Sequence, residues 1–290
     1  MRTSRARAEP SAAELSARAW PSWGRLVWVS MRSQNRTFWR NPVPVFFTLG
    51  LPLIMLVLFG SLFSWDIDVG FGPIPAAQFY APALAAFTAA NAALSNVGIT
   101  LAFQRQFGLL KRIKGTPLPP SAFLGGTVVS SVWIALLGTL IMFLAGVLFF
   151  DVGIAAAKIP AAALSFAVGT AAFAGLGLAL AALSPSGNTA PAVANAVILP
   201  MAFVSNVFVP AEDPPDWLRI LGDVLPLKHF SSAFSAAFHP AVAAPAWRGT
   251  DLAIMVAWGA GGALVAWRFF DWMPRVAGRR RAPKAAAGQA

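Results

Sequence analysis

The chain has 290 residues, of which 57% are hydrophobic and only 11% are charged, and its formal net charge is +11. Because a soluble domain carries about 25% charged residues, this composition leaves too little polar surface to cover a globule in water and favours a membrane protein. The sequence has no cysteine, which excludes disulfides, thiolate metal sites and cysteine nucleophiles.

Ahead of the first apolar run, residues 22–40 are predicted to form an amphipathic helix. Apolar side chains recur there at the spacing of one helical face, and three arginines lie largely apart from them. The apolar set is Trp23, Leu26, Val27 and Met31, and the arginines are Arg25, Arg32 and Arg36. Tryptophan beside arginine is typical of a helix lying in the headgroup plane of a membrane. The alternative is a solvated basic tail.

Long charge-free runs predict six membrane-spanning helices, because one crossing needs about 20 apolar residues. The runs lie at 43–65, 80–104, 120–150, twice within 159–211, and at 252–267. The sequence "LSPSGNTAP" is the turn signal between the fourth and fifth helices. The expected fold is therefore an all-α polytopic membrane protein with an N-terminal interfacial helix.

One further apolar-leaning stretch, residues 229–247, is interrupted by Ser, His and Pro. We interpret it as an interfacial or re-entrant segment, and the alternative is a seventh span. Three parts are then expected. Residues 1–42 form a tail with the interfacial helix. Residues 43–272 form the six-span domain, with a loop at 104–120 and an outer segment at 211–250. Residues 273–290 form a basic tail.

The charges alternate between the two sides of this predicted topology. Of the 22 Lys and Arg residues, 18 lie before residue 42, in the 105–120 loop, or from residue 268 onward. Eight of the 11 acidic residues lie in the remaining loops. The positive-inside rule then places both termini and the 105–120 loop in the cytoplasm, for a multi-pass protein of the inner or plasma membrane. This distribution explains the net charge without a nucleic-acid partner.

The interiors of the predicted spans hold no ionisable residue, and the sequence has no HExxH, GxSxG or GxxxxGK[ST] motif. An ion-driven transporter usually carries intramembrane ionisable residues. We therefore predict no catalytic, metal-binding or cofactor-binding residue, and the chain is not expected to be an enzyme.

Mildly polar side chains do occur within the spans. Thr88, Asn91 and Ser95 are predicted to share one face of the second span, and Asn195 and Asn206 one face of the fifth. They are interpreted either as interhelical hydrogen-bonding groups or as a polar line along a substrate path.

The loop "RQFGLLKRIKGTPLPP", residues 105–120, holds four cations and no acid. Its spacing predicts a short helix with Phe107 and Leu110 on one side and Lys111 and Lys114 on the other, ended by Gly-Thr-Pro. A solvated basic loop would not need the apolar side. A short helix that docks on a cytoplasmic partner would.

This loop resembles the one that follows the second span in permeases of type-2 ATP-binding-cassette exporters, a group that includes bacterial drug and antibiotic efflux permeases. The matching residues are Arg105, Gly108, Leu110, Lys111, Thr116 and Pro117. The loop departs from the family pattern at Gln106, where an acid is usual, and at Ile113, where Leu is usual. Residues 40–63, 79–86 and 208–230 also resemble that family.

The resemblance implies a half-transporter that pairs as a homodimer and binds two copies of a separate ATPase, which would bind the ATP. The short loop helix would be the coupling helix seated in that ATPase. The residues expected to couple are Arg105, Phe107, Gly108, Leu110, Lys111, Arg112, Thr116 and Pro117.

A cavity without fixed charge favours amphipathic or hydrophobic cargo, such as a drug, an antibiotic or a lipid-like molecule. Four alternatives stay open. They are a lipid or glycan exporter permease of the same family, a secondary transporter or channel working without an ATPase, a membrane enzyme, and a non-transporting scaffold.

Overall fold

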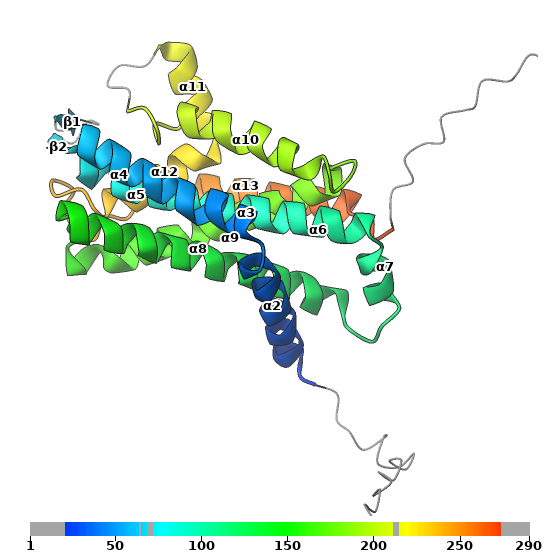
Figure 1. Cartoon of the computed structure of the whole chain (residues 1–290). Helices are drawn as coiled ribbons and strands as arrows, with labels where there is room; N and C mark the ends of the chain where they lie inside the picture. The colour runs from blue at the N-terminus through cyan, green and yellow to red at the C-terminus, as the bar shows by residue number, and fades with distance from the viewer. Residues whose placement is uncertain (1–20, 64, 69–71, 211–214, 274–290) are drawn as a thin grey trace, which may run out of the picture.

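The computed structural model describes residues 21–63, 65–68, 72–210 and 215–273. They form an elongated helical bundle with a short β-hairpin at one end and the helix α7 at the other (Figure 1). We call these the hairpin end and the α7 end. The predicted tails at 1–20 and 274–290 lie outside the described residues.

The elements follow the apolar runs and the Pro and Gly punctuation of the sequence. The α-helices are α2 (Trp23–Trp39), α3 (Pro42–Val45), α4 (Leu51–Leu62), α5 (Ala76–Asn91), α6 (Val97–Gln106), α7 (Leu109–Lys114), α8 (Pro120–Phe150), α9 (Ile159–Leu183), α10 (Ala190–Val204), α11 (Asp216–Val224), α12 (Pro226–Ala236) and α13 (Gly249–Phe269). Two π-helical turns, η1 (Phe46–Gly50) and η2 (Ala92–Asn96), join α3 to α4 and α5 to α6, and η3 (Ala156–Lys158) is a 3-10 turn. Strands β1 (Asp66–Asp68) and β2 (Pro73–Pro75) pair antiparallel, with Ile67 opposite Ile74.

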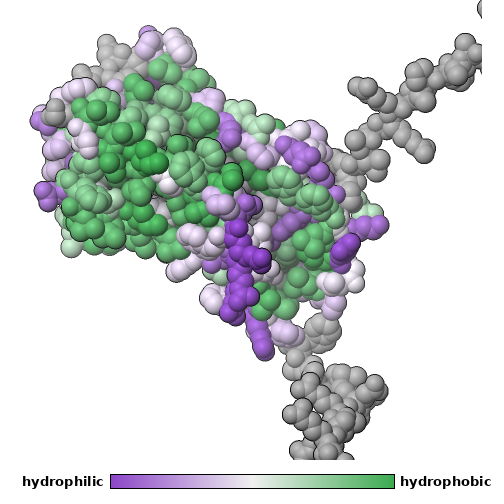
Figure 2. Space-filling model, viewed as in Figure 1, coloured by the Kyte–Doolittle hydropathy of each residue, from purple (hydrophilic) through white to green (hydrophobic). Residues whose placement is uncertain are grey.

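Five helical segments of the described chain are long and apolar enough to cross a membrane. They are Pro42–Leu62, Ala76–Gln106, Pro120–Phe150, Ala156–Leu183 and Gly249–Phe269. Their exposed side chains form a broad hydrophobic surface from the hairpin end to the level of α2 (Figure 2). The all-α polytopic prediction is confirmed, and five of the six predicted spans are present at full length.

The fifth predicted span appears as α10, which has only 15 residues. At 1.5 Å per residue it is about 22 Å long, shorter than a hydrocarbon core of about 30 Å. The chain continues without a helix to Phe208, whose carbonyl accepts from the Tyr80 hydroxyl at 3.5 Å. Irregular backbone at membrane depth is tolerated where protein buries it, and Ser205, Val207 and Phe208 are buried.

The alternative interpretation of residues 229–247 as a seventh span is wrong, because α12 has only 11 residues and a membrane crossing needs about 20. Its buried side, formed by Leu227, Phe230 and Phe234, packs against α5, α9 and α13 inside the hairpin end of the bundle. Gly169 of α9 admits the ring of Phe230, since a Cβ there would lie 2.4 Å from that ring. The sequence of α12 therefore serves to fill the bundle end.

Helix α2 forms within the predicted range and crosses the long axis of the bundle (Figure 1). A hydrophilic band lies over it on the surface (Figure 2), as expected for a helix in the headgroup plane. Its buried face overlaps the predicted stripe in part: Met31 is buried with Ser30, Gln34 and Phe38, and Leu26 and Val27 are half-buried, whereas Trp23 is 56% exposed. Contact with α8 decides the face, since Gly126 of α8 leaves room only for the α2 backbone near Ser30.

The most extensive helix pairing is between α9 and α13. Glycines face each other across it, and a Cβ built on Gly175 would lie 2.6 Å from the Gly259 carbonyl oxygen. Small residues permit this close approach, which replaces the hydrophobic driving force that lipid cannot supply.

Candidate functional site

The α7 end of the bundle carries the loop that the sequence singles out. Gly108 joins α6 to α7 with φ 69°, a left-handed conformation that glycine adopts without steric cost. At the other end of α7, the Thr116 hydroxyl donates to the Ile113 carbonyl at 2.7 Å and accepts from the Leu118 amide at 3.4 Å. The Gly108 turn and the Thr116 hydrogen bonds orient α7 across the end of α6 (Figure 1).

Arg105 is buried, with 2% of its surface exposed. Its Nη1 donates to the Ala181 carbonyl at 2.9 Å and its Nη2 to the Ser184 carbonyl at 2.5 Å. The last carbonyls of a helix lack intrahelical partners, and the end of α9 also favours a cation. Arg105 therefore fastens α6 to α9. The prediction that this side chain contacts an ATPase is wrong for the described conformation.

Leu110 is fully buried at 0% exposure, whereas Phe107 is 71% and Leu109 is 41% exposed. The predicted shared face of Phe107 and Leu110 is therefore wrong. That face assumed one continuous helix, but the left-handed Gly108 separates the two residues. Phe107 ends α6 and stacks on Phe103, with ring centroids 6.1 Å apart.

The outward surface of this end, which we call the α7 surface, is thus apolar and basic. It comprises the exposed side chains of Phe107, Leu109, Lys111, Arg112, Lys114, Thr116 and Pro117. Leu110 holds it to the bundle from below.

Gln106 has a structural role that the sequence did not reveal. Its Oε1 accepts from the Gly187 amide at 2.6 Å and the Asn188 amide at 3.3 Å, in the turn between α9 and α10. A carboxylate would accept the same two bonds. The departure from the acid usual at this position therefore preserves the contact.

The predicted polar line of the second span is partly assembled. Ser95 donates to Asn91 Oδ1 at 2.8 Å across the π-helical turn η2. Thr88 instead donates to the Leu84 carbonyl of its own helix at 2.7 Å and is fully buried.

The predicted face shared by Asn195 and Asn206 is wrong. Asn195 lies exposed on α10. Asn206 follows the end of α10 with φ 56°, so helical spacing does not relate the two residues. Asn206 instead lines a cavity at the hairpin end.

A second set of polar contacts, not singled out from the sequence, links η2 to α8 and α6 to α2. Asn96 Nδ2 donates to Ser131 Oγ at 3.0 Å, and Gln104 Nε2 donates to Gln34 Oε1 at 3.0 Å. Gln34 in turn donates to Thr127 Oγ1 at 3.3 Å. These bonds favour the interhelical interpretation of mild polar groups in this part of the bundle.

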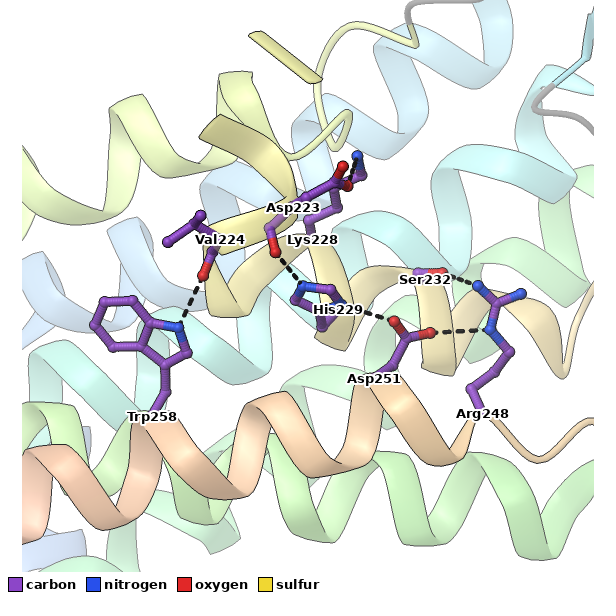
Figure 3. Close-up of polar contacts among 8 residues, drawn as sticks. All are labelled: Asp223, Val224, Lys228, His229, Ser232, Arg248, Asp251 and Trp258. Atoms are coloured by element: carbon purple, nitrogen blue, oxygen red, sulfur yellow. Dashed lines mark hydrogen bonds and ion pairs between the residues drawn. The ribbon is translucent and has the colours of Figure 1, made fainter. Parts of the chain in front are cut away.

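The hairpin end holds a charged cluster that joins α12 to α13 (Figure 3). Asp251 is 7% exposed. Its Oδ1 lies 2.7 Å from His229 Nδ1, and its Oδ2 accepts from Arg248 Nε at 2.9 Å. His229 Nε2 donates to the Asp223 carbonyl at 2.8 Å, because a carbonyl oxygen can only accept.

The same cluster extends toward α11. Lys228 Nζ lies 2.6 Å from Asp223 Oδ1, and Trp258 Nε1 donates to the Val224 carbonyl at 2.8 Å (Figure 3). Among the described residues, no group of three or more His, Asp or Glu side chains suits a metal ion. These contacts position α11 and α12.

The polytopic bundle and the short basic helix α7 at one end have the arrangement that the sequence predicts for a membrane transport permease. The family model described as "ABC-2 type transporter" matches residues 25–239. The chain therefore belongs to the ABC-2 type transporter family, and it is a multi-pass membrane protein.

Curated relatives agree at low identity. The chain is 25% identical over 228 residues to "Putative transport permease ycf38" of Porphyra purpurea, covering 76% of this chain and 75% of that protein. It is 24% identical over 195 residues to "Putative transport permease YvfS" of Bacillus subtilis, covering 67% and 77%. Both relatives are named as transport permeases, which supports a permease subunit.

Proposed function

We propose that this permease is the membrane subunit of an ATP-driven exporter and that a separate ABC ATPase binds its α7 surface. The observation that carries the proposal is the exposure of Phe107 at the end of α6, 71%, and of Leu109 on α7, 41%, beside the exposed cations Lys111 and Arg112. An exposed apolar group with a basic rim is typical of a protein-binding site.

The energetics favour the two apolar side chains as the main anchors. Burying each at an interface would contribute roughly 1.5–3 kcal/mol, whereas an exposed ion pair contributes about 0–1 kcal/mol. Lys111, Arg112 and Lys114 would mainly set the association rate and its dependence on salt. Leu110 and Arg105 act indirectly, by holding α7 and α6 in place.

The proposed orientation puts the α7 end in the cytoplasm. Helices α2 and α7, which carry arginines and lysines, lie toward this end, whereas β1 and α11, which each begin with an aspartate, lie toward the other (Figure 1). The positive-inside rule assigns the basic side to the cytoplasm, where the ATP is.

The proposed cargo is amphipathic or hydrophobic, such as a drug, an antibiotic or a lipid-like molecule. The polar groups within the second span are hydroxyls and amides, which bond to each other or to backbone. These groups carry no fixed charge. A homodimer of permeases, expected from the family resemblance, would enclose the path between two copies.

Site-specific photo-crosslinking tests the ATPase contact. We would place benzoylphenylalanine at Phe107, at Leu109 and, as a matched control, at Trp217, which is 66% exposed on α11 at the opposite end. Crosslinks from positions 107 and 109 to a protein carrying GxxxxGK[ST] are expected, with none from position 217.

A transport assay separates this proposal from a secondary transporter. The purified permease alone in liposomes should move no fluorescent amphipathic dye, whether or not a pH gradient is present. Dye uptake driven by a pH gradient without any ATPase would refute the proposal, and so would crosslinks to the ATPase from position 217 only.

A further inference from the structure

A cavity of about 170 Å³ opens at the hairpin end, between the start of α5, the turn after α10, and α12. It lies at the end of the bundle opposite α7, where an exporter would release its cargo. Eight of its 11 lining residues are polar. They are Gln78, Ser205, Asn206, Lys228, Ser231, Ser232, Ser235 and His239.

The polar wall is built by one face of α12. Lys228, Ser231, Ser235 and His239 recur at helical spacing toward the cavity. The opposite face carries Leu227, Phe230 and Phe234 into the core. Serine and histidine residues that interrupt this apolar stretch of sequence therefore line the cavity.

Two of the lining hydroxyls have no hydrogen-bond partner among the described residues: Ser205 Oγ and Ser235 Oγ. Ser205 is 3% exposed. A buried polar atom without a partner costs free energy and calls for a ligand or an ordered water. The side chains of Asn206 and Ser231 also have no recorded hydrogen bond in the described chain and line the same space.

The cations near the cavity are already engaged. Lys228 pairs with Asp223 at 2.6 Å, and Arg248 pairs with Asp251 at 2.9 Å. Lys158 donates to the His239 carbonyl at 2.7 Å and does not line the cavity. The groups still available are hydroxyls and an amide, which both donate and accept. This inventory disfavours an anion and favours a neutral ligand with several hydroxyls.

Size and shape agree with that chemistry. The cavity volume of about 170 Å³ is far above the roughly 10–15 Å³ that one water requires, and it leaves space for a small ring-shaped ligand. Ile74, Phe79 and Ala236 form an apolar wall, against which the C–H face of a sugar can pack.

We propose that this cavity binds a single neutral sugar ring, carried by a glycolipid or glycosylated cargo or present as free sugar. The inference deepens the proposed export function, and rests on it only for the idea that cargo reaches this end. Binding itself requires neither ATP nor the ATPase.

Saturation-transfer NMR on the full-length permease in polymer nanodiscs, free of sugar detergents, tests the proposal. The probes are a panel of methyl glycosides, with glycerol 3-phosphate as the anionic comparison and cyclohexanol as the apolar one. Saturation transfer to the ring protons of at least one glycoside is expected. Preference for glycerol 3-phosphate or cyclohexanol, or no transfer to any glycoside, would overturn the proposal.

Variants tie the signal to the cavity. Ser205→Ala and Ser235→Ala should each weaken glycoside binding about 3- to 10-fold, the effect of losing one neutral hydrogen bond. Neither should lower thermal stability, because each removes a buried hydroxyl that has no protein partner. Ser130→Ala is the matched control, since Ser130 Oγ is also buried without a partner but lies on α8 away from the cavity.

Unchanged binding in the Ser205→Ala/Ser235→Ala double variant would refute the cavity as the site. Competition between methyl glycosides and a monoglycosyl diacylglycerol placed in the nanodisc identifies the source of the ring. Competition by the lipid indicates that the sugar ring belongs to a membrane lipid. If the lipid does not compete, the ring belongs to a soluble molecule. Failure of all sugar binding would leave the ATPase crosslinks from position 107 unaffected, so the two proposals fail separately.

Discussion

Replacing Arg105 with alanine is expected to destabilise the permease from inside the bundle. The guanidinium donates to two carbonyls at the end of α9, those of Ala181 and Ser184. A hydrogen bond from a charged group contributes roughly 1.5–3 kcal/mol, so losing both would cost about 3–6 kcal/mol. The substitution also removes the cation at the negative end of the α9 dipole.

Arg112→Ala provides the control for charge, because Arg112 belongs to the same loop but is exposed. An exposed cation contributes about 0–1 kcal/mol. Thermal unfolding of the solubilised permease can be followed through the fluorescence of its 11 tryptophans. Arg105→Ala should lower the midpoint by several degrees, and Arg112→Ala should leave it unchanged.

Arg105→Lys refines the test. A lysine keeps the charge, but its compact ammonium lacks the planar fork that reaches both carbonyls, so an intermediate midpoint is expected. The reasoning would be refuted if Arg105→Ala unfolded at the wild-type temperature and yet lost the ATPase. That result would mean that Arg105 contacts the partner and that its buried bonds contribute little.

Three further predictions follow from the geometry. Gly108→Ala places a side chain at φ 69°, which costs about 1–2 kcal/mol. The variant should have a clearly lower rate of transport-coupled ATP hydrolysis and an unfolding midpoint close to that of the wild type. Gly175→Leu would push a side chain into the α13 backbone, 2.6 Å from its Cβ, and should abolish folded protein on size-exclusion chromatography. Gly261→Leu, with open space at its Cβ, should not. In intact cells, an impermeant thiol reagent should label Asp216→Cys but not Lys114→Cys, and the reverse pattern would invert the proposed orientation.

The helices were predictable because their signals are local. Apolar runs long enough to cross a membrane, prolines at helix starts and a Ser-Pro-Ser-Gly-Asn turn each act within a few residues. Helix α8 begins at Pro120, within the predicted proline pair, and α9 ends at Leu183, where the predicted turn signal begins. The 105–120 loop was also predicted to hold a short helix ended by Gly-Thr-Pro, and α7 ends at Lys114.

The side-chain assignments were less predictable because each depends on a backbone irregularity or a distant partner. The left-handed Gly108 separates Phe107 from Leu110, and the helical spacing that grouped them does not apply. Arg105 donates hydrogen bonds to carbonyls that lie 76 and 79 residues away in the chain. The bond between His229 and Asp251 joins two helices across 22 residues. Neither a periodicity nor a motif marks such pairings.

The contacts at the α7 end explain how a displacement there can reach the opposite end. Arg105 ties α6 to the end of α9, and Gln106 ties α6 to the turn that begins α10. A movement of α7 therefore acts on three helices together. Helix α9 packs on α12 and α13, and α10 leads directly to Ser205 and Asn206 in the wall of the polar cavity. Because packed helices move as rigid elements, we expect the proposed ATPase closure at α7 to alter the cavity through α9 and α10 rather than through α4, much of which is exposed.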